Sequence, residues 1–192
     1  MKKIPTLFER IYDKHKVVGI TDTVYPGMEW VLKGKGDATV KWDGSCCAII
    51  NGEFYKRYDA KKGKIPPEDA IPCCDPDPIT GHHPHWIKVT DNPADKWFWE
   101  AYKNTIVKTD GTYEAIGLHF QGNPYGLNID ILRPHGRDIV KVRRTFDGIR
   151  NFLTDNDIEG LVFWKDGEPQ CKIKRTDFGL SWGKGMEKNE RV

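Results

Sequence analysis

The chain has 192 residues, of which 38% are hydrophobic and 30% are charged, and its formal net charge is +2. These values are typical of a globular protein with one sizeable domain, and they exclude a disordered chain. The longest clean apolar run, residues 46–50, is too short to cross a bilayer, so we expect no membrane segment. Five cysteines without a secretory signal favour reduced thiols in the cytoplasm of a bacterium or phage host.

The first part of the chain predicts a short helix followed by several strands. Residues 6–14 are expected to form the helix. Strand-like patterns cover residues 28–33, 38–42, 46–50 and 53–58. Asp43-Gly44 and Asn51-Gly52 are both expected to close hairpins, because these dipeptides favour tight two-residue turns.

The remainder of the chain adds an ordered loop, two helices and three strands. Residues 63–86, rich in proline, glycine and histidine, predict the loop. Apolar residues at helical spacing predict helices over 94–107 and 145–154. The strands are expected at 112–120, 159–164 and 170–175, with Asp166-Gly167 between the last two. Frequent hairpin signals among few helices predict an α+β fold with mainly antiparallel sheets.

Taken one at a time, the chemically interesting residues have ordinary explanations. Lys41 in KWDG is either a strand-end lysine beside a turn or a nucleophile. Glu114 in TYEAIG fits the solvent face of a half-buried strand. Lys172 and Lys174 flank Ile173, and strand alternation places both lysines on one face.

The order of these residues is more specific than any one of them. The chain contains KxDG at Lys41, then Arg57, Glu114, EGLVF from Glu159, and KIK at 172–174. This set resembles the motifs of the covalent nucleotidyltransferases, which include ATP-dependent ligases and mRNA capping enzymes. The resemblance extends over residues 38–182, most of the chain.

The residue types also suit nucleotide chemistry. A lysine amine must be neutral to attack phosphorus, and nearby positive charge and burial lower its pKa from about 10.4. Lys172 and Lys174 could supply that positive charge and stabilise a phosphate. Glu114 and Glu159 offer the carboxylate oxygens that Mg²⁺ or Mn²⁺ prefers.

Further stretches resemble a compact RNA ligase family, the RNA ligase 1 family. They are KWDGSCC, PDPITGHHPHW, GTYEAIGLHFQGNPYGL, His135-Gly136, DIEGLVFW and CKIKRTDFGLSW. Only 18 residues follow Lys174, too few for an OB-fold. The resemblance implies a single nucleotidyltransferase domain over 1–192, with an ATP-grasp-like ligase adenylylation fold. Two mainly antiparallel sheets would flank its nucleotide pocket, and the protein would be a monomer without an OB-fold.

The resemblance also implies a reaction and a site. Lys41 would take AMP from ATP and pass it to an RNA 5′-phosphate, which a 3′-hydroxyl then attacks. The implied ATP-binding residues are Lys41, Arg57, Glu114, Glu159, Lys172 and Lys174. Glu114 and Glu159 would hold Mg²⁺ or Mn²⁺, and the RNA ends would contact Arg57, His85 and Arg175.

Two other functions stay open at this point. The chain could be a DNA-end ligase or another nucleotidyltransferase, or a non-catalytic RNA-binding module on the same fold. A zinc site in the Cys/His-rich stretch 72–86 is disfavoured, because the adjacent cysteines do not match the usual C-x₂-C spacing. That stretch instead predicts a rigid surface loop.

Overall fold

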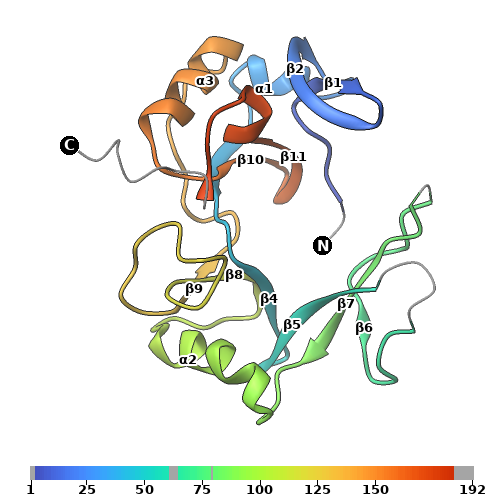
Figure 1. Cartoon of the computed structure of the whole chain (residues 1–192), viewed down its shortest axis with the longest axis vertical. Helices are drawn as coiled ribbons and strands as arrows, with labels where there is room; N and C mark the ends of the chain where they lie inside the picture. Colours follow the sequence, from blue (N-terminus) through green and yellow to red (C-terminus); the bar gives the residue numbers. More distant parts are fainter. Residues whose placement is uncertain (1–2, 61–64, 79, 184–192) are drawn as a thin grey trace. The chain divides into compact units, whose positions relative to one another are not determined.

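The computed structural model describes residues 3–60, 65–78 and 80–183 (Figure 1). It divides into two compact units. The middle unit contains Gly44–His135, and the terminal unit contains Ile4–Asp43 together with the chain from Gly136 onward. Both combine helices with antiparallel sheets, as predicted. No helix in the described ranges is long and apolar enough to cross a membrane.

The terminal unit is built on a three-stranded antiparallel sheet. Its order is β11 (Glu168–Lys174), β10 (Gly160–Lys165) and β3 (Asp37–Lys41). The backbone N–H of Val40 donates to the carbonyl of Asp138 at 2.9 Å on one edge. On the other edge, the N–H of Leu7 donates to the carbonyl of Lys172 at 2.7 Å. Both edges therefore have backbone partners and do not invite pairing with another chain.

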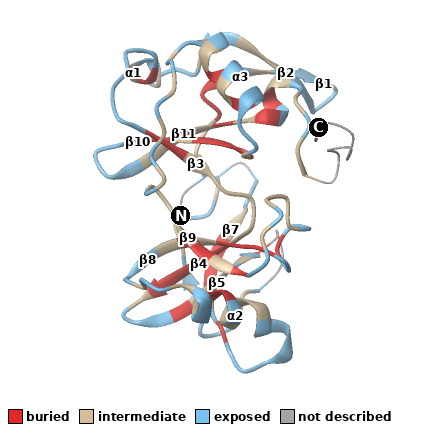
Figure 2. Ribbon diagram, turned by 90° about the vertical axis from the view of Figure 1, so that its left-hand side faces the viewer, coloured by how far each residue is buried: buried red, intermediate tan, exposed pale blue. Residues whose placement is uncertain are grey.

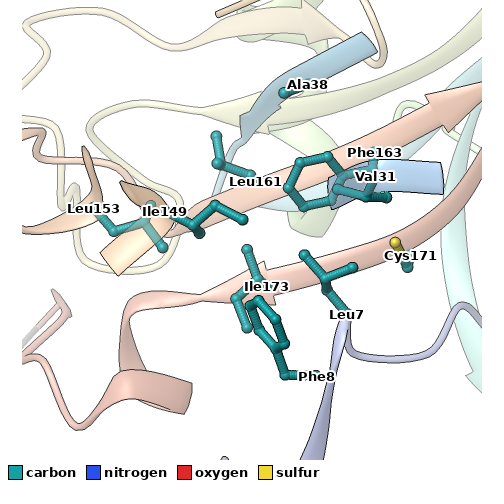
Figure 3. Close-up of a cluster of buried hydrophobic side chains, with 10 residues drawn as sticks. All are labelled: Leu7, Phe8, Val31, Ala38, Ile149, Leu153, Leu161, Phe163, Cys171 and Ile173. Carbon is teal, nitrogen blue, oxygen red and sulfur yellow. The ribbon is translucent and has the colours of Figure 1, made fainter. Parts of the chain in front are cut away.

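The two faces of this sheet differ because side chains alternate along each strand. The side chains on one face pack against side chains of the elements that cover it and form a fully buried hydrophobic cluster (Figure 3). Its members are Leu7, Phe8, Val31, Ala38, Ile149, Leu153, Leu161, Phe163, Cys171 and Ile173. Helices α1 (Glu29–Leu32) and α3 (Phe146–Asp155) contribute to it. The opposite face of the sheet carries the side chains of Lys41, Lys172 and Lys174.

The middle unit is built on a six-stranded antiparallel sheet. Its order is β6 (Ile71–Pro72), β7 (His83–Lys88), β5 (Glu53–Ala60), β4 (Ser45–Ile50), β8 (Gly111–Ile116) and β9 (Ile131–Pro134). Helix α2 (Lys96–Asn104) follows a 3-10 turn, η1 (Pro93–Asp95), that is capped by Asn92. Ala101 of helix α2 packs on the face of the sheet that carries Cys47 and Tyr113. Figure 2 shows buried residues, drawn in red, along the strands of this sheet.

The two predicted hairpins have different outcomes. Asn51 and Gly52 have positive φ angles of 50° and 77° and join β4 to β5, as predicted. The hairpin at Asp43-Gly44 is wrong, because β3 pairs with β10 whereas β4 pairs with β5 and β8. Gly44 is needed for close packing instead, since a Cβ there would lie 2.1 Å from the carbonyl oxygen of Ala115.

Two predicted elements near the N-terminus are also wrong. The expected helix over 6–14 is strand β1 (Phe8–Asp13), which forms a hairpin with β2 (Lys16–Val24). The expected strand over 28–33 is the helix α1, where burial of Val31 overrides the strand preference of its residue type.

Later elements agree better with the sequence. Both predicted helices are present as α2 and α3, and the last two strands are β10 and β11. The strand expected over 112–120 ends at Ile116. The ordered loop expected over 63–86 is wrong at Ile71–Pro72, which is β6, and in its last part, which belongs to β7 with His85 and Trp86 buried. Residues 61–64 and 79 lie outside the described ranges.

Candidate functional site

Lys41 lies at the end of β3 beside a buried carboxylate. Strand pairing places Lys41 opposite Gly160 of β10, and Gly160 opposite Lys174 of β11. Glu159, only 4% exposed, immediately precedes Gly160. The Nζ atom of Lys41 contacts Oε2 of Glu159, and the Nζ atom of Lys174 lies 2.5 Å from Oε1. Two lysines from distant parts of the chain therefore share one carboxylate.

Gly160 allows this arrangement. A Cβ at this position would lie 2.1 Å from the carbonyl oxygen of Ile173 and 2.9 Å from the Cα of Lys174. Any side chain would push β10 away from β11. The glycine of the EG pair therefore sets the close spacing that lets Glu159 reach both lysines.

Lys172 adds a third positive group to the same face. Burial lowers its pKa from 10.5 to about 8, helped by the positive charges of Lys41, Lys174 and Arg10 and opposed by Glu159. A half-buried lysine among other cations and one carboxylate is suited to attract a phosphate.

Asp43 is a second carboxylate in this cluster that the sequence analysis missed. Burial raises its pKa, and the negative charge of Glu159 adds to the effect. The indole N–H of Trp182 donates to its Oδ2 atom at 2.8 Å. The signal was the aspartate of KxDG itself, which we interpreted only as a turn residue.

Arg175 stabilises the main chain next to Glu159 through several hydrogen bonds. Its backbone N–H donates to the carbonyl of Glu159 at 2.9 Å. Its guanidinium donates to the carbonyls of Leu153, Asn156 and Ser181. Because the side chain is buried and bound to the main chain, Arg175 stabilises the chain next to Glu159.

Glu114 lies in the middle unit in a separate polar group. It is opposite Cys46 in the pairing of β8 with β4. Its Oε2 atom lies 3.0 Å from Nε2 of His135, whose Nδ1 atom lies 3.0 Å from the hydroxyl of Thr112. Burial raises the pKa of the Cys46 thiol to about 12. No local pattern in the sequence associates Cys46 or His135 with this glutamate.

The other predicted contacts also lie in the middle unit. Arg57 on β5 forms an ion pair with Asp59, with Nε 3.0 Å from Oδ1. His85 on β7 is 4% exposed, and its Nδ1 atom lies 2.8 Å from the carbonyl oxygen of His83. The structure thus groups Lys41, Glu159, Lys172 and Lys174 in one unit, and places Arg57 and Glu114 on the sheet of the other.

The comparisons with known proteins give a limited result. No protein-family model matches the chain. The chain is similar to RNA ligase 1 of Danio rerio, with 26% identity over a stretch that covers 53% of this chain and 42% of the relative. The chain therefore spans less than half the length of the curated relative it matches.

Proposed function

We propose that this protein is an ATP-dependent RNA ligase that joins an RNA 5′-phosphate to a 3′-hydroxyl through a lysyl-AMP intermediate on Lys41. The observation that carries the proposal is the convergence of Lys41, Lys172 and Lys174 on Glu159. The similarity to an RNA ligase supports RNA as the substrate. A nucleotidyltransferase fold formed by a single domain and a monomeric state belong to the same proposal.

The first step would be attack by the neutral Lys41 amine on the α-phosphorus of ATP. A nitrogen–phosphorus bond forms, and the bond to the departing pyrophosphate breaks. Glu159 contacts the attacking amine and would accept its proton. Lys172 and Lys174 would stabilise the negative charge that develops on the phosphate oxygens.

The second and third steps would use the stored AMP. An oxygen of the RNA 5′-phosphate attacks the adenylyl phosphorus and releases Lys41. The RNA 3′-hydroxyl then attacks the activated 5′-phosphate, forms the new phosphodiester and releases AMP. Arg57 and the cation cluster would bind the phosphates of the RNA and the nucleotide.

Of the two glutamates expected to hold Mg²⁺ or Mn²⁺, Glu159 offers hard carboxylate oxygens beside the lysine cluster. Glu114 lies in the other unit, where its neighbours are a thiol and an imidazole nitrogen. Both oxygens of Glu159 already contact lysines, so an ion bound there would share this carboxylate with Lys41 and Lys174. When bound, the metal would offset the charge of the ATP phosphates.

The direct test is transfer of label from α-labelled ATP to the protein in the presence of Mg²⁺ or Mn²⁺. We expect one acid-labile label per chain in the wild type and none in Lys41→Ala. Lys141→Ala, which removes an exposed lysine of the same unit, is the matched control and should label normally. Label that survives Lys41→Ala would overturn the proposed mechanism.

A substrate panel then tests the choice of RNA. Labelled protein should seal RNA ends that carry a 5′-phosphate and a 3′-hydroxyl. Sealing of nicked DNA alone would identify a DNA-end ligase, and labelling by GTP in place of ATP would indicate capping chemistry. RNA binding without any label would identify a non-catalytic module.

A further inference from the structure

Three potential metal ligands meet on one face of the six-stranded sheet. They are Cys46 on β4, Glu114 on β8, and His135 directly after β9. These strands are neighbours, so residues far apart in sequence come together. The thiol sulfur, a carboxylate oxygen and a ring nitrogen all lie within 4.8 Å of one another.

The burial of this group separates it from ordinary surface carboxylates. Cys46 is 8% exposed, and the side chains of Glu114 and His135 are 14% and 16% exposed. A largely buried carboxylate beside a thiol and an imidazole is costly without strong partners. A bound cation would supply such a partner to all three groups.

His135 is held in an orientation that suits ligation. Its backbone N–H donates to the carbonyl of Thr112 at 3.0 Å, which fixes the residue at the end of β9. Its Nδ1 atom lies 3.0 Å from the Thr112 hydroxyl. Without an ion, the 3.0 Å contact between Nε2 and Oε2 of Glu114 requires a shared proton. With the proton on Nδ1 and donated to the Thr112 hydroxyl, Nε2 has a lone pair for an ion bound between it and Glu114, an arrangement common in histidines that bind metals.

The donor types select the class of ion. Sulfur and imidazole nitrogen suit Zn²⁺ and similar transition metals, whereas Mg²⁺ takes mainly oxygen ligands. We propose that Cys46, Glu114 and His135 form a three-ligand site for a transition-metal ion of the Zn²⁺ class, with the fourth position open. The inference goes beyond the proposed ligase function, because it needs neither the lysine cluster nor a nucleotide.

The neighbouring positive charge is compatible with this site. Arg57 is close enough to act electrostatically on Cys46 and Glu114, and it is paired with Asp59. Arg133 lies opposite Glu114 on β9. Binding releases the thiol proton to solvent. One thiolate and one carboxylate then neutralise the two charges of the ion, so the ligated ion adds no net charge beside the arginines.

The test uses the full chain, freed of metal and titrated with Co²⁺ as a spectroscopic probe. We expect one ion per chain, with an intense thiolate-to-cobalt absorption band and visible bands of a four-coordinate site. Cys46→Ser should abolish the thiolate band. Glu114→Gln and His135→Gln should each weaken binding about 100-fold, and Thr112→Val about 10-fold through loss of orientation.

Cys47→Ala is the matched control. Cys47 is also buried but lies on the opposite face of the sheet, so its removal should leave the band unchanged. Thermal unfolding of each metal-free variant checks folding, and Zn²⁺ should raise the melting temperature of the wild type and the control only.

The proposal is overturned if the wild type shows no thiolate band, if the band survives Cys46→Ser, or if only Mg²⁺ binds. Loss of the band in Cys73→Ser with retention in Cys46→Ser would assign a different thiol and would also overturn it. All measurements are made without ATP or RNA, so the outcome is independent of the labelling of Lys41.

Discussion

At the residue scale, the balance of charge around Glu159 has consequences for stability as well as chemistry. Glu159 is the carboxylate that directly contacts Lys41 and Lys174. Lys172 is placed among these cations, and its lowered pKa shows that its charged form is disfavoured in the folded protein. Groups with shifted pKa values are often costly to the fold in this way, and they are common at functional sites.

Replacement of Lys172 by methionine should therefore stabilise the protein while it impairs adenylylation. Below a pH of about 8 the charged amine costs the folded state free energy that methionine avoids. We expect a gain of about 2 kcal/mol at pH 7, measured by urea unfolding. Lys141→Met, at an exposed lysine of the same unit, should leave the free energy of unfolding within about 0.5 kcal/mol of the wild type.

The pH dependence of the same variant gives a second measurement of this prediction. The folded pKa of Lys172 is about 8, below its ordinary value of 10.5, so the unfolded chain binds more protons between these two pH values. The wild type should accordingly gain stability, relative to Lys172→Met, as the pH rises through this window. An equal difference at pH 7 and pH 10 would contradict the prediction.

At the scale of strands, Gly160 controls the spacing of β10 and β11. Gly160→Ala should cost about 2 kcal/mol or more of stability, because the new methyl group meets the backbone of β11. It should also lower the rate of adenylylation, since it displaces Glu159 from the lysines. Both are measured in one preparation, by urea unfolding and by the label assay.

Gly19→Ala is the control for this variant. Gly19 lies in strand β2 of the same unit, and a Cβ there meets nothing within 4 Å. Its effect on stability should be small. If the two alanine variants are equally stable and equally active, the close approach at Gly160 has no importance for the site.

The turns show which elements could be predicted from the sequence. Asn51-Gly52 and Asp166-Gly167 close two-residue hairpins with positive φ angles, and their residue types favour that conformation. Lys14 and His15 close β1 and β2 with φ angles of 43° and 71°, although Lys-His is not one of the dipeptides typical of two-residue hairpins. No local signal marked that hairpin, and residues 6–14 were therefore predicted as a helix.

The order of the motifs along the sequence predicts part of the candidate site, because motifs of one site are expected to lie close together in the fold. Of the residues expected in one site, Lys41, Glu159, Lys172 and Lys174 lie together because β10 pairs with both β3 and β11. Arg57 and Glu114, expected in the same site, lie in the other unit. The contacts of Cys46, Glu114 and His135 depend on the order of β4, β8 and β9 in a sheet. Local patterns in the sequence do not specify which strands become neighbours.

At the scale of the whole molecule, chain order and spatial grouping do not coincide. The middle unit combines Lys3 with Gly44–His135, whereas the terminal unit combines Ile4–Asp43 with the chain from Gly136 onward. After the N-terminal residues, the chain passes between the units at Asp43-Gly44 and at His135-Gly136. Both crossings contain a glycine and a residue of the candidate sites, so the same short motifs serve the fold and the proposed chemistry.

The pairing of β3 with β10 also bears on how the protein is made. Lys41 leaves the ribosome long before Glu159 and Lys174, and Gly44–His135 of the middle unit is synthesised between them. Closing this long-range contact is a late event in folding, since non-local strand pairs form slowly. A nascent chain therefore contains Lys41 without Glu159 and Lys174, and the lysine cluster cannot assemble until β11 has been synthesised.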